Sequence, residues 1–190
     1  MDAACNRVSE VDVFRTYEVV RKYTGEIGSL CFVVRRPGWP FCREQALTLN
    51  VLANNFGEYL EEIPIFGVVK EVGIDDAGLV EFQRDYFPYP LYRDQSHAFY
   101  KAMGDRKAVG MLLNPFSIAF MAWDAFQRLT RKKIGGNLKG EGIVQGGIII
   151  FDNQGMPIAM YQEETGVDLP VADLAIALQR IRERQESGAR

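Results

Sequence analysis

The sequence has little histidine and little cysteine, and both shortages narrow the possible functions. A single histidine, His97, in 190 residues argues against a transition-metal centre, because imidazole is the commonest side-chain ligand there. The three cysteines, Cys5, Cys31 and Cys42, are widely spaced and contain no CxxC pair. That pattern fits neither the disulfide framework of a small secreted domain nor a zinc site. We therefore expect no metal and no organic cofactor.

The sequence also lacks a strong net charge and a targeting segment. Its formal net charge of −3 gives no electrostatic reason to bind nucleic acid. The first ten residues have neither the apolar core of a secretory signal nor the Arg- and Ser-rich pattern of a transit peptide. Because a processed chloroplast or mitochondrial protein would have the same beginning, we expect a cytoplasmic or organellar protein that is not secreted.

What is present is an alternation of apolar runs typical of an α/β domain with a mixed sheet covered on both faces. The pattern predicts strands over residues 29–35, 63–70, 89–93, 148–152 and 156–161, and helices over 9–23, 42–57, 77–84, 95–103 and 171–184. The last two strands form a hairpin, and Pro157 assigns the second of them to a sheet edge. We expect one domain over 28–184, preceded by a tail and helix (1–27) and followed by a tail (185–190).

An apolar segment over residues 108–126 has basic residues on both sides, within 108–133. Asn114, Pro115 and Asp124 interrupt it, which argues against a membrane-spanning helix. Two alternatives remain open. The segment is either a helix packed on the core of its own domain or one that faces a protein partner or a membrane surface.

Cys42 is the candidate reactive group. It follows Pro40 at the predicted start of a helix, where free backbone N–H groups favour an anion, and Arg43 is its neighbour. Arg35 and Arg36 end the preceding strand. These features predict a thiol pKa lowered from about 8.5 towards neutrality, although a structural cysteine in a strand-to-helix turn is an equal alternative.

The other cysteines and motifs are weaker candidates. Cys31 lies in a buried strand and is interpreted as an inert core thiol, whereas Cys5 lies in the tail and could resolve an oxidised Cys42. The glycine-rich residues 135–142 do not match a phosphate-binding loop and are interpreted as turns. His97 is interpreted as an exposed residue at a helix start.

Residues 33–46, VVRRPGWPFCREQA, resemble the active-site segment of the peroxiredoxin-like 2 family, which includes selenoprotein U. Residues 136–142, GNLKGEG, are similar to a second motif of that family. The resemblance implies a thioredoxin-like fold of the AhpC/TSA type, with an inserted apolar helix near 112–130. It also implies a thiol-based antioxidant or reductase role.

The sequence departs from the family and from peroxiredoxins at several positions. Trp39 takes the place of the first cysteine of the CxxC motif and supplies no hydroxyl group. The later peroxiredoxin arginine would fall near Gly146, and the cis-proline of thioredoxins has no counterpart in residues 144–147. Arg35, Arg36, Arg43 or Arg93 would have to replace the missing arginine.

Two hypotheses follow. In the first, the Cys42 thiolate attacks a peroxide or a disulfide, and an external thiol is the reductant. Pro37 and Trp39 shape the pocket. Arg36 or Arg43 stabilises the anion. In the second, the chain is a catalytically degenerate thioredoxin-fold subunit with a scaffold role in a larger complex, such as an organellar membrane complex, with residues 108–133 as the contact.

Overall fold

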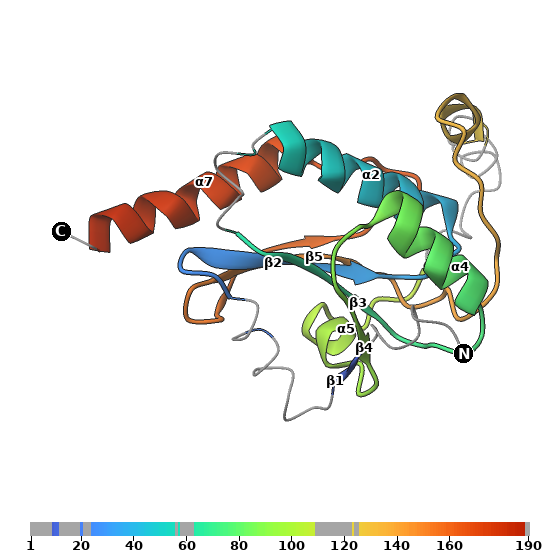
Figure 1. Cartoon of the computed structure of the whole chain (residues 1–190), viewed down its shortest axis with the longest axis horizontal. Helices are drawn as coiled ribbons and strands as arrows, with labels where there is room; N and C mark the ends of the chain where they lie inside the picture. Colours follow the sequence, from blue (N-terminus) through green and yellow to red (C-terminus); the bar gives the residue numbers. More distant parts are fainter. Residues whose placement is uncertain are drawn as a thin grey trace.

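A six-stranded mixed sheet organises the chain in the computed structural model, which describes residues 9–11, 20, 24–55, 57, 63–108, 123 and 126–188 (Figure 1). The elements in chain order are β1 (Ser9–Val11), β2 (Gly28–Val34), α2 (Pro40–Asn55), β3 (Ile65–Val69), α4 (Asp76–Glu81), the π-helical turn η2 (Phe82–Tyr86), β4 (Leu91–Asp94), α5 (Ala98–Ala102), β5 (Gly147–Asp152), β6 (Pro157–Gln162) and α7 (Val171–Gly188). The strand order is β1-β4-β3-β2-β5-β6. The strand β2 is parallel to β3 and antiparallel to β5, so the sheet is mixed as predicted.

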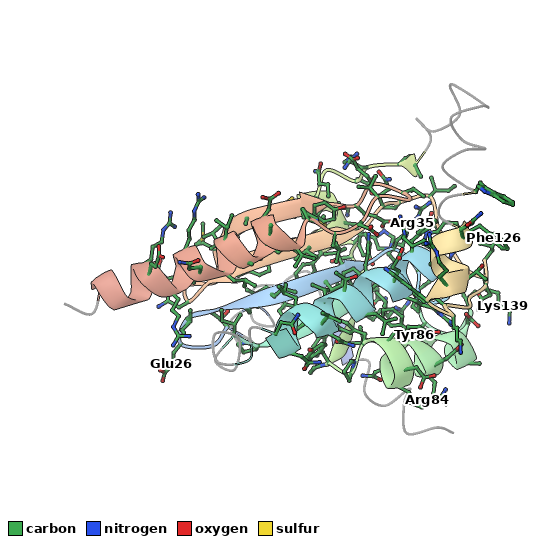
Figure 2. The ribbon with its side chains drawn as sticks, turned by 90° about the horizontal axis from the view of Figure 1, so that it is seen from above. Glu26, Arg35, Arg84, Tyr86, Phe126 and Lys139 are labelled. Carbon is green, nitrogen blue, oxygen red and sulfur yellow. The ribbon has the colours of Figure 1, made fainter. Side chains whose placement is uncertain are left out.

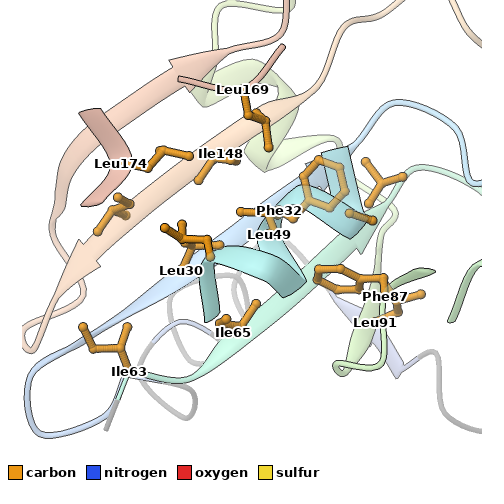
Figure 3. Close-up of a cluster of buried hydrophobic side chains, with 14 of the residues drawn as sticks. Leu30, Phe32, Leu49, Ile63, Ile65, Phe87, Leu91, Ile148, Leu169 and Leu174 are labelled. Atoms are coloured by element: carbon orange, nitrogen blue, oxygen red, sulfur yellow. The ribbon is translucent and has the colours of Figure 1, made fainter. Parts of the chain in front are cut away.

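Alternate residues of the central strands face two separate cores. All seven residues of β2 are buried, as expected of a continuous apolar run covered on both faces. Leu30 and Phe32 belong to the core beneath α2 and α7, which Figure 3 shows. Cys31 and Val33 belong to the core on the α5 side.

The helices cover the two faces unequally. Figure 1 shows α2, α4 and α7 on one side of the sheet and the short α5 on the other. Apolar residues spaced three to four apart, such as Leu49 and Leu52 of α2 and Leu174 and Leu178 of α7, are buried on the first side. That spacing is the periodicity on which the helices were predicted.

The hairpin and the edge position of its second strand are confirmed. β5 and β6 pair antiparallel, and β6 is the last strand of the sheet, so Pro157 lies on an edge. Three other predictions differ from the structure. Residues 9–11 form β1 beside β4 instead of opening a helix, and α5 begins only at Ala98, because His97 has a left-handed φ of 56°. The last helix extends to Gly188, beyond its predicted end.

The apolar helix predicted near 112–130 lies largely outside the described residues. Within it, Trp123 and residues 126–131 are helical, and Trp123 and Phe126 are both 63% exposed. Searched over the part of the chain that the structure describes, no helix is long and apolar enough to cross a membrane.

Candidate functional site

The candidate site lies where β2 ends and α2 begins. Arg36 accepts a backbone hydrogen bond from Trp39 N at 3.0 Å, which closes a tight turn, and Pro40 then starts α2. Cys42 is therefore the third residue of the helix. Figure 2 shows Arg35 towards the end of the molecule that carries Phe126 and Lys139, opposite Glu26.

The Cys42 thiol is completely buried, and its acidity is the opposite of the prediction. Burial raises the pKa of Cys42 from 9.0 to about 12, and the nearby Glu163 carboxylate contributes to the rise. Hydrogen bonds from the backbone N–H groups of Arg36 and Arg35, and the positive charge of Arg35, act in the opposite direction. The predicted lowering of this pKa is wrong because removal of the thiolate from water outweighs these groups.

Trp39 packs over the core that contains Cys42, with two guanidinium groups on its ring. The Arg36 Cζ lies 4.9 Å and the Arg35 Cζ 5.3 Å from the indole centroid. The indole Nε1 is buried without a hydrogen-bond partner. Trp39 and the two arginines therefore form a stack at the edge of the core to which Cys42 belongs, and we refer to it as the cover.

The Arg43 side chain binds groups other than the Cys42 thiol. Its guanidinium points to α4, where Nη2 contacts Glu81 Oε2 at 2.7 Å, and its Nε donates to the Pro37 carbonyl at 3.2 Å. The ring of Tyr86 lies 4.9 Å from its Cζ. Arg43 is 1% exposed, so this buried cation fixes the turn to the neighbouring helix, and the predicted contact with the thiolate is not made.

The glycine-rich residues 135–142 clamp the same turn. Asn137 N donates to the Gly38 carbonyl at 2.7 Å, and Arg36 Nη1 donates to the carbonyls of Leu138 at 2.7 Å and Gly140 at 3.1 Å. A Cβ on Gly38 would lie 2.4 Å from Asn137 Oδ1. The prediction of turns did not anticipate that this loop holds the site.

Glu163 is the residue that sequence reasoning missed. Its carboxylate is 1% exposed, contacts Arg35 Nη1 at 3.3 Å and accepts a hydrogen bond from Gly146 N at 3.1 Å. In the sequence Gln-Glu-Glu-Thr after an edge strand looks like a solvated charged run, so no signal marked it. A Cβ on Gly146 would lie 2.0 Å from the Val33 carbonyl oxygen, which explains why no arginine occupies this position.

The remaining predicted groups lie away from the sulfur or outside the described residues. Burial and the charge of Asp94 raise the pKa of Cys31 well above its ordinary value, which agrees with an inert core thiol. Arg93 lies on β4, and His97 is half-buried at the start of α5. Cys5 lies outside the described residues. The described part of the chain contains no group of His, Cys, Asp or Glu side chains that could hold a metal.

Comparison with known proteins identifies the family. Residues 51–165 match the AhpC/TSA antioxidant enzyme family. The chain is 30% identical to Peroxiredoxin-like 2A of Gallus gallus over 177 residues, which cover 92% of this chain and 72% of the relative. The chain belongs to the peroxiredoxin-like 2 proteins of the AhpC/TSA family. Its function is therefore redox-related.

Other relatives agree over shorter regions. Peroxiredoxin-like 2A of Danio rerio is 31% identical over 138 residues, which cover 72% of this chain and 60% of the relative. The human protein of the same name is 30% identical over 141 residues, which cover 73% of this chain and 57% of the relative. Family membership thus covers the described domain, and the relatives are longer.

Solved structures confirm the thioredoxin-like fold. Peroxiredoxin 6 of Arenicola marina superposes with a TM-score of 0.53 at 10% identity, covering 88% of this chain and 66% of that one. The bacterioferritin comigratory protein of Xanthomonas campestris gives 0.51 at 16% identity, covering 86% and 82%. At such identities the likeness establishes the fold alone.

Proposed function

We propose that the protein is a thiol oxidoreductase that works with one cysteine, Cys42, and that keeps this thiol covered until Trp39 moves aside. The substrate is a peroxide or a disulfide, and the reductant is an external thiol. One observation carries the proposal. The backbone N–H groups of Arg36 and Arg35 and the positive charge of Arg35 act to lower the pKa of Cys42, and such groups favour a thiolate once water can reach it.

The chemical step with a peroxide proceeds from the thiolate. The Cys42 sulfur attacks one peroxide oxygen, an S–O bond forms, and the O–O bond breaks. The sulfur is oxidised to a sulfenic acid, and the peroxide is reduced to an alkoxide or hydroxide that takes a proton from water. One external thiol then forms a mixed disulfide and releases water, and a second external thiol restores Cys42 and leaves as a disulfide.

A different observation favours the second hypothesis, a scaffold subunit without turnover. Cys42 is completely buried with a pKa of about 12, and Trp39 occupies the position of the family's first cysteine. A thiol that stays in this state reacts slowly with any oxidant, because the thiolate is the nucleophile. The two functions differ in whether the cover opens.

The test is oxidation of the Cys5→Ser protein, in which Cys31 and Cys42 are the remaining thiols. The protein is treated with excess hydrogen peroxide in the presence of dimedone, and the adducts are located by mass spectrometry. We expect an adduct on Cys42 and none on Cys31. In the Trp39→Ala variant we expect the Cys42 adduct to form at least ten times faster, because the cover is gone.

Trp123→Ala is the matched control, since this exposed tryptophan lies in a different element from the cover. It should leave the rate unchanged. If Cys42 remains unmodified under excess peroxide in both the parent protein and Trp39→Ala, the oxidoreductase proposal is wrong and the scaffold function stands.

A further inference from the structure

We propose that Glu163 is a positioning residue that restrains Cys42 by neutralising Arg35, the cation at the site. The inference rests on the proposed function, because it concerns the control of the same thiol. Glu163 lies 121 positions after Cys42 (163 − 42) and follows β6, whereas Cys42 follows β2. The argument depends on how the carboxylate and the guanidinium are held.

Arg35 is fixed by three groups from the segments that flank the β5–β6 hairpin. Its Nε donates to the Gly142 carbonyl at 2.5 Å, and its Nη1 donates to Thr165 Oγ1 at 2.8 Å and contacts Glu163 Oε1 at 3.3 Å. Arg35 is 8% exposed and Glu163 is 1% exposed. Since both charges are withdrawn from water, each depends on the other for compensation.

Glu163 is held as firmly as its partner. Its Oε2 accepts a hydrogen bond from Gly146 N at 3.1 Å, and its backbone N donates to the Gly146 carbonyl at 2.9 Å. Gly146 in turn packs on the end of β2, where its missing Cβ leaves room for the Val33 carbonyl. The carboxylate is therefore fixed next to the end of β2, from which Arg35 and Arg36 act to lower the pKa of Cys42.

The groups that interact electrostatically with Cys42 come from three parts of the chain. Arg35 and Arg36 follow β2, Glu163 follows β6, and the buried Tyr100 belongs to α5. Arg36 also interacts electrostatically with Glu71 and Glu141, and its Nη1 donates hydrogen bonds to carbonyls of the loop 135–142. Tyr100 is buried, and its hydroxyl donates to the Val34 carbonyl at 2.7 Å. Glu163 and Arg35 are thus two fixed, opposite charges. The Arg35 cation favours the Cys42 thiolate, and the Glu163 carboxylate opposes it.

The balance can be altered with a neutral isostere. Glu163→Gln keeps an oxygen that can accept a hydrogen bond from Gly146 N, but leaves the positive charge of Arg35 uncompensated. An uncompensated cation beside a thiol favours the thiolate. Arg35→Gln should disfavour the Cys42 thiolate, because it leaves the buried Glu163 carboxylate without its cation.

The experiment measures alkylation of Cys42 by iodoacetamide in the folded Cys5→Ser protein between pH 7 and 10. Cys31 is buried in the opposite core and is affected by Asp94, so its alkylation reports general opening of the fold. The Cys42-to-Cys31 ratio of rates therefore corrects for any loss of stability. Peroxide is not used, so a failure of the oxidoreductase proposal leaves this result interpretable.

We expect Glu163→Gln to raise the ratio about tenfold at pH 8, which corresponds to one pKa unit, and to move the pH profile towards lower pH. Arg35→Gln should lower the ratio, and it carries the test if Glu163→Gln does not fold. Glu81→Gln, which removes the partner of the other buried arginine, should leave the ratio unchanged. A ratio within twofold of the parent protein in both Glu163→Gln and Arg35→Gln would overturn the inference.

Discussion

At the scale of single residues, the environment of Cys42 decides its chemistry more than its position at a helix start does. The third residue of a helix does gain from free N–H groups and from the macrodipole, but that effect is modest. Complete removal of a thiolate from water is a larger penalty, and here it dominates. The sequence supplied the position of the thiol, whereas the degree of burial depends on Trp39 and on residues far along the chain.

This burial predicts a pH dependence of stability. The pKa of Cys42 is about 12 in the folded protein and near 9.0 when the chain unfolds, so the folded state keeps a proton that the unfolded state loses between these values. Stability from this group is complete below pH 9.0 and falls by up to about 1.4 kcal/mol for each pH unit above it. Urea denaturation at pH 8 and 10.5 should therefore show a steeper decline for the wild type than for Cys42→Ser.

The comparison between the two proteins isolates Cys42, because the raised pKa values of Cys31 and Tyr100 are common to both. Equal declines in the two proteins would contradict the burial of the thiol.

Gly146 gives a second prediction at this scale. In Gly146→Ala the new Cβ would lie 2.0 Å from the Val33 carbonyl oxygen and 2.9 Å from Arg35 N, which are both backbone atoms. The strands must separate, and we expect a loss of about 2–3 kcal/mol in the free energy of unfolding. Gly135→Ala is the control, since no atom lies within 4 Å of its Cβ position. Equal urea midpoints for the two variants would show that the strand end adapts.

At the scale of elements, the turn between β2 and α2 is held from two sides. Arg43 ties it to α4 through Glu81, and residues 135–142 bind it through Asn137 and Arg36. The Arg43–Glu81 bond joins residues 38 positions apart, and the Arg36–Leu138 bond joins residues 102 positions apart. Under the proposed function, this clamp would keep the geometry of the turn while the Trp39 side chain moves.

Arg43→Ala should therefore destabilise the protein by about 3 kcal/mol, because it removes a buried cation and leaves the Pro37 and Gly135 carbonyls without a donor. Arg84→Ala is the control. Arg84 also pairs with a carboxylate, that of Asp85, but its side chain is 69% exposed, and we expect no measurable change in the urea midpoint. A similar midpoint for both variants would refute the clamp.

The elements that sequence reasoning predicted well are those with strong local patterns. The apolar run of β2, the turn of the β5–β6 hairpin with Asn153 and Gly155, and the spacing of Leu174 and Leu178 each determine their element locally. Residues 9–11 were predicted wrongly, because they become a strand only through pairing with β4, whereas Val20 is helical as predicted and the rest of the predicted helix 9–23 lies outside the described residues. The Arg35–Glu163 pair was not predictable, since it joins residues 128 positions apart.

At the scale of the whole molecule, the sheet passes from a fully buried centre to an exposed edge. β2 lies between β3 and β5 and is buried throughout, whereas β6 is the outer strand and none of its residues is fully buried. Cores form on both faces of the centre, and the short helix α5 lies over one of them. The centre is therefore the most stable part of the fold.

This gradient predicts the order of amide hydrogen exchange. Peptides from Gly28–Val34 should exchange slowest, near the rate set by global unfolding, and those from Pro157–Gln162 should exchange earlier through local opening. Exchange followed by mass spectrometry tests the order. Protection of β6 equal to that of β2 would mean that the edge is covered by another chain.

The position of Trp39 also gives the molecule an optical reporter. The sequence has two tryptophans, and the other one, Trp123, is 63% exposed. In Trp123→Phe the remaining indole would emit from beneath two guanidinium groups, packed against the core that contains Cys42. A red shift of that emission on addition of an oxidant, timed against thiol loss in the same cuvette, would show whether the cover lifts before or after the sulfur reacts.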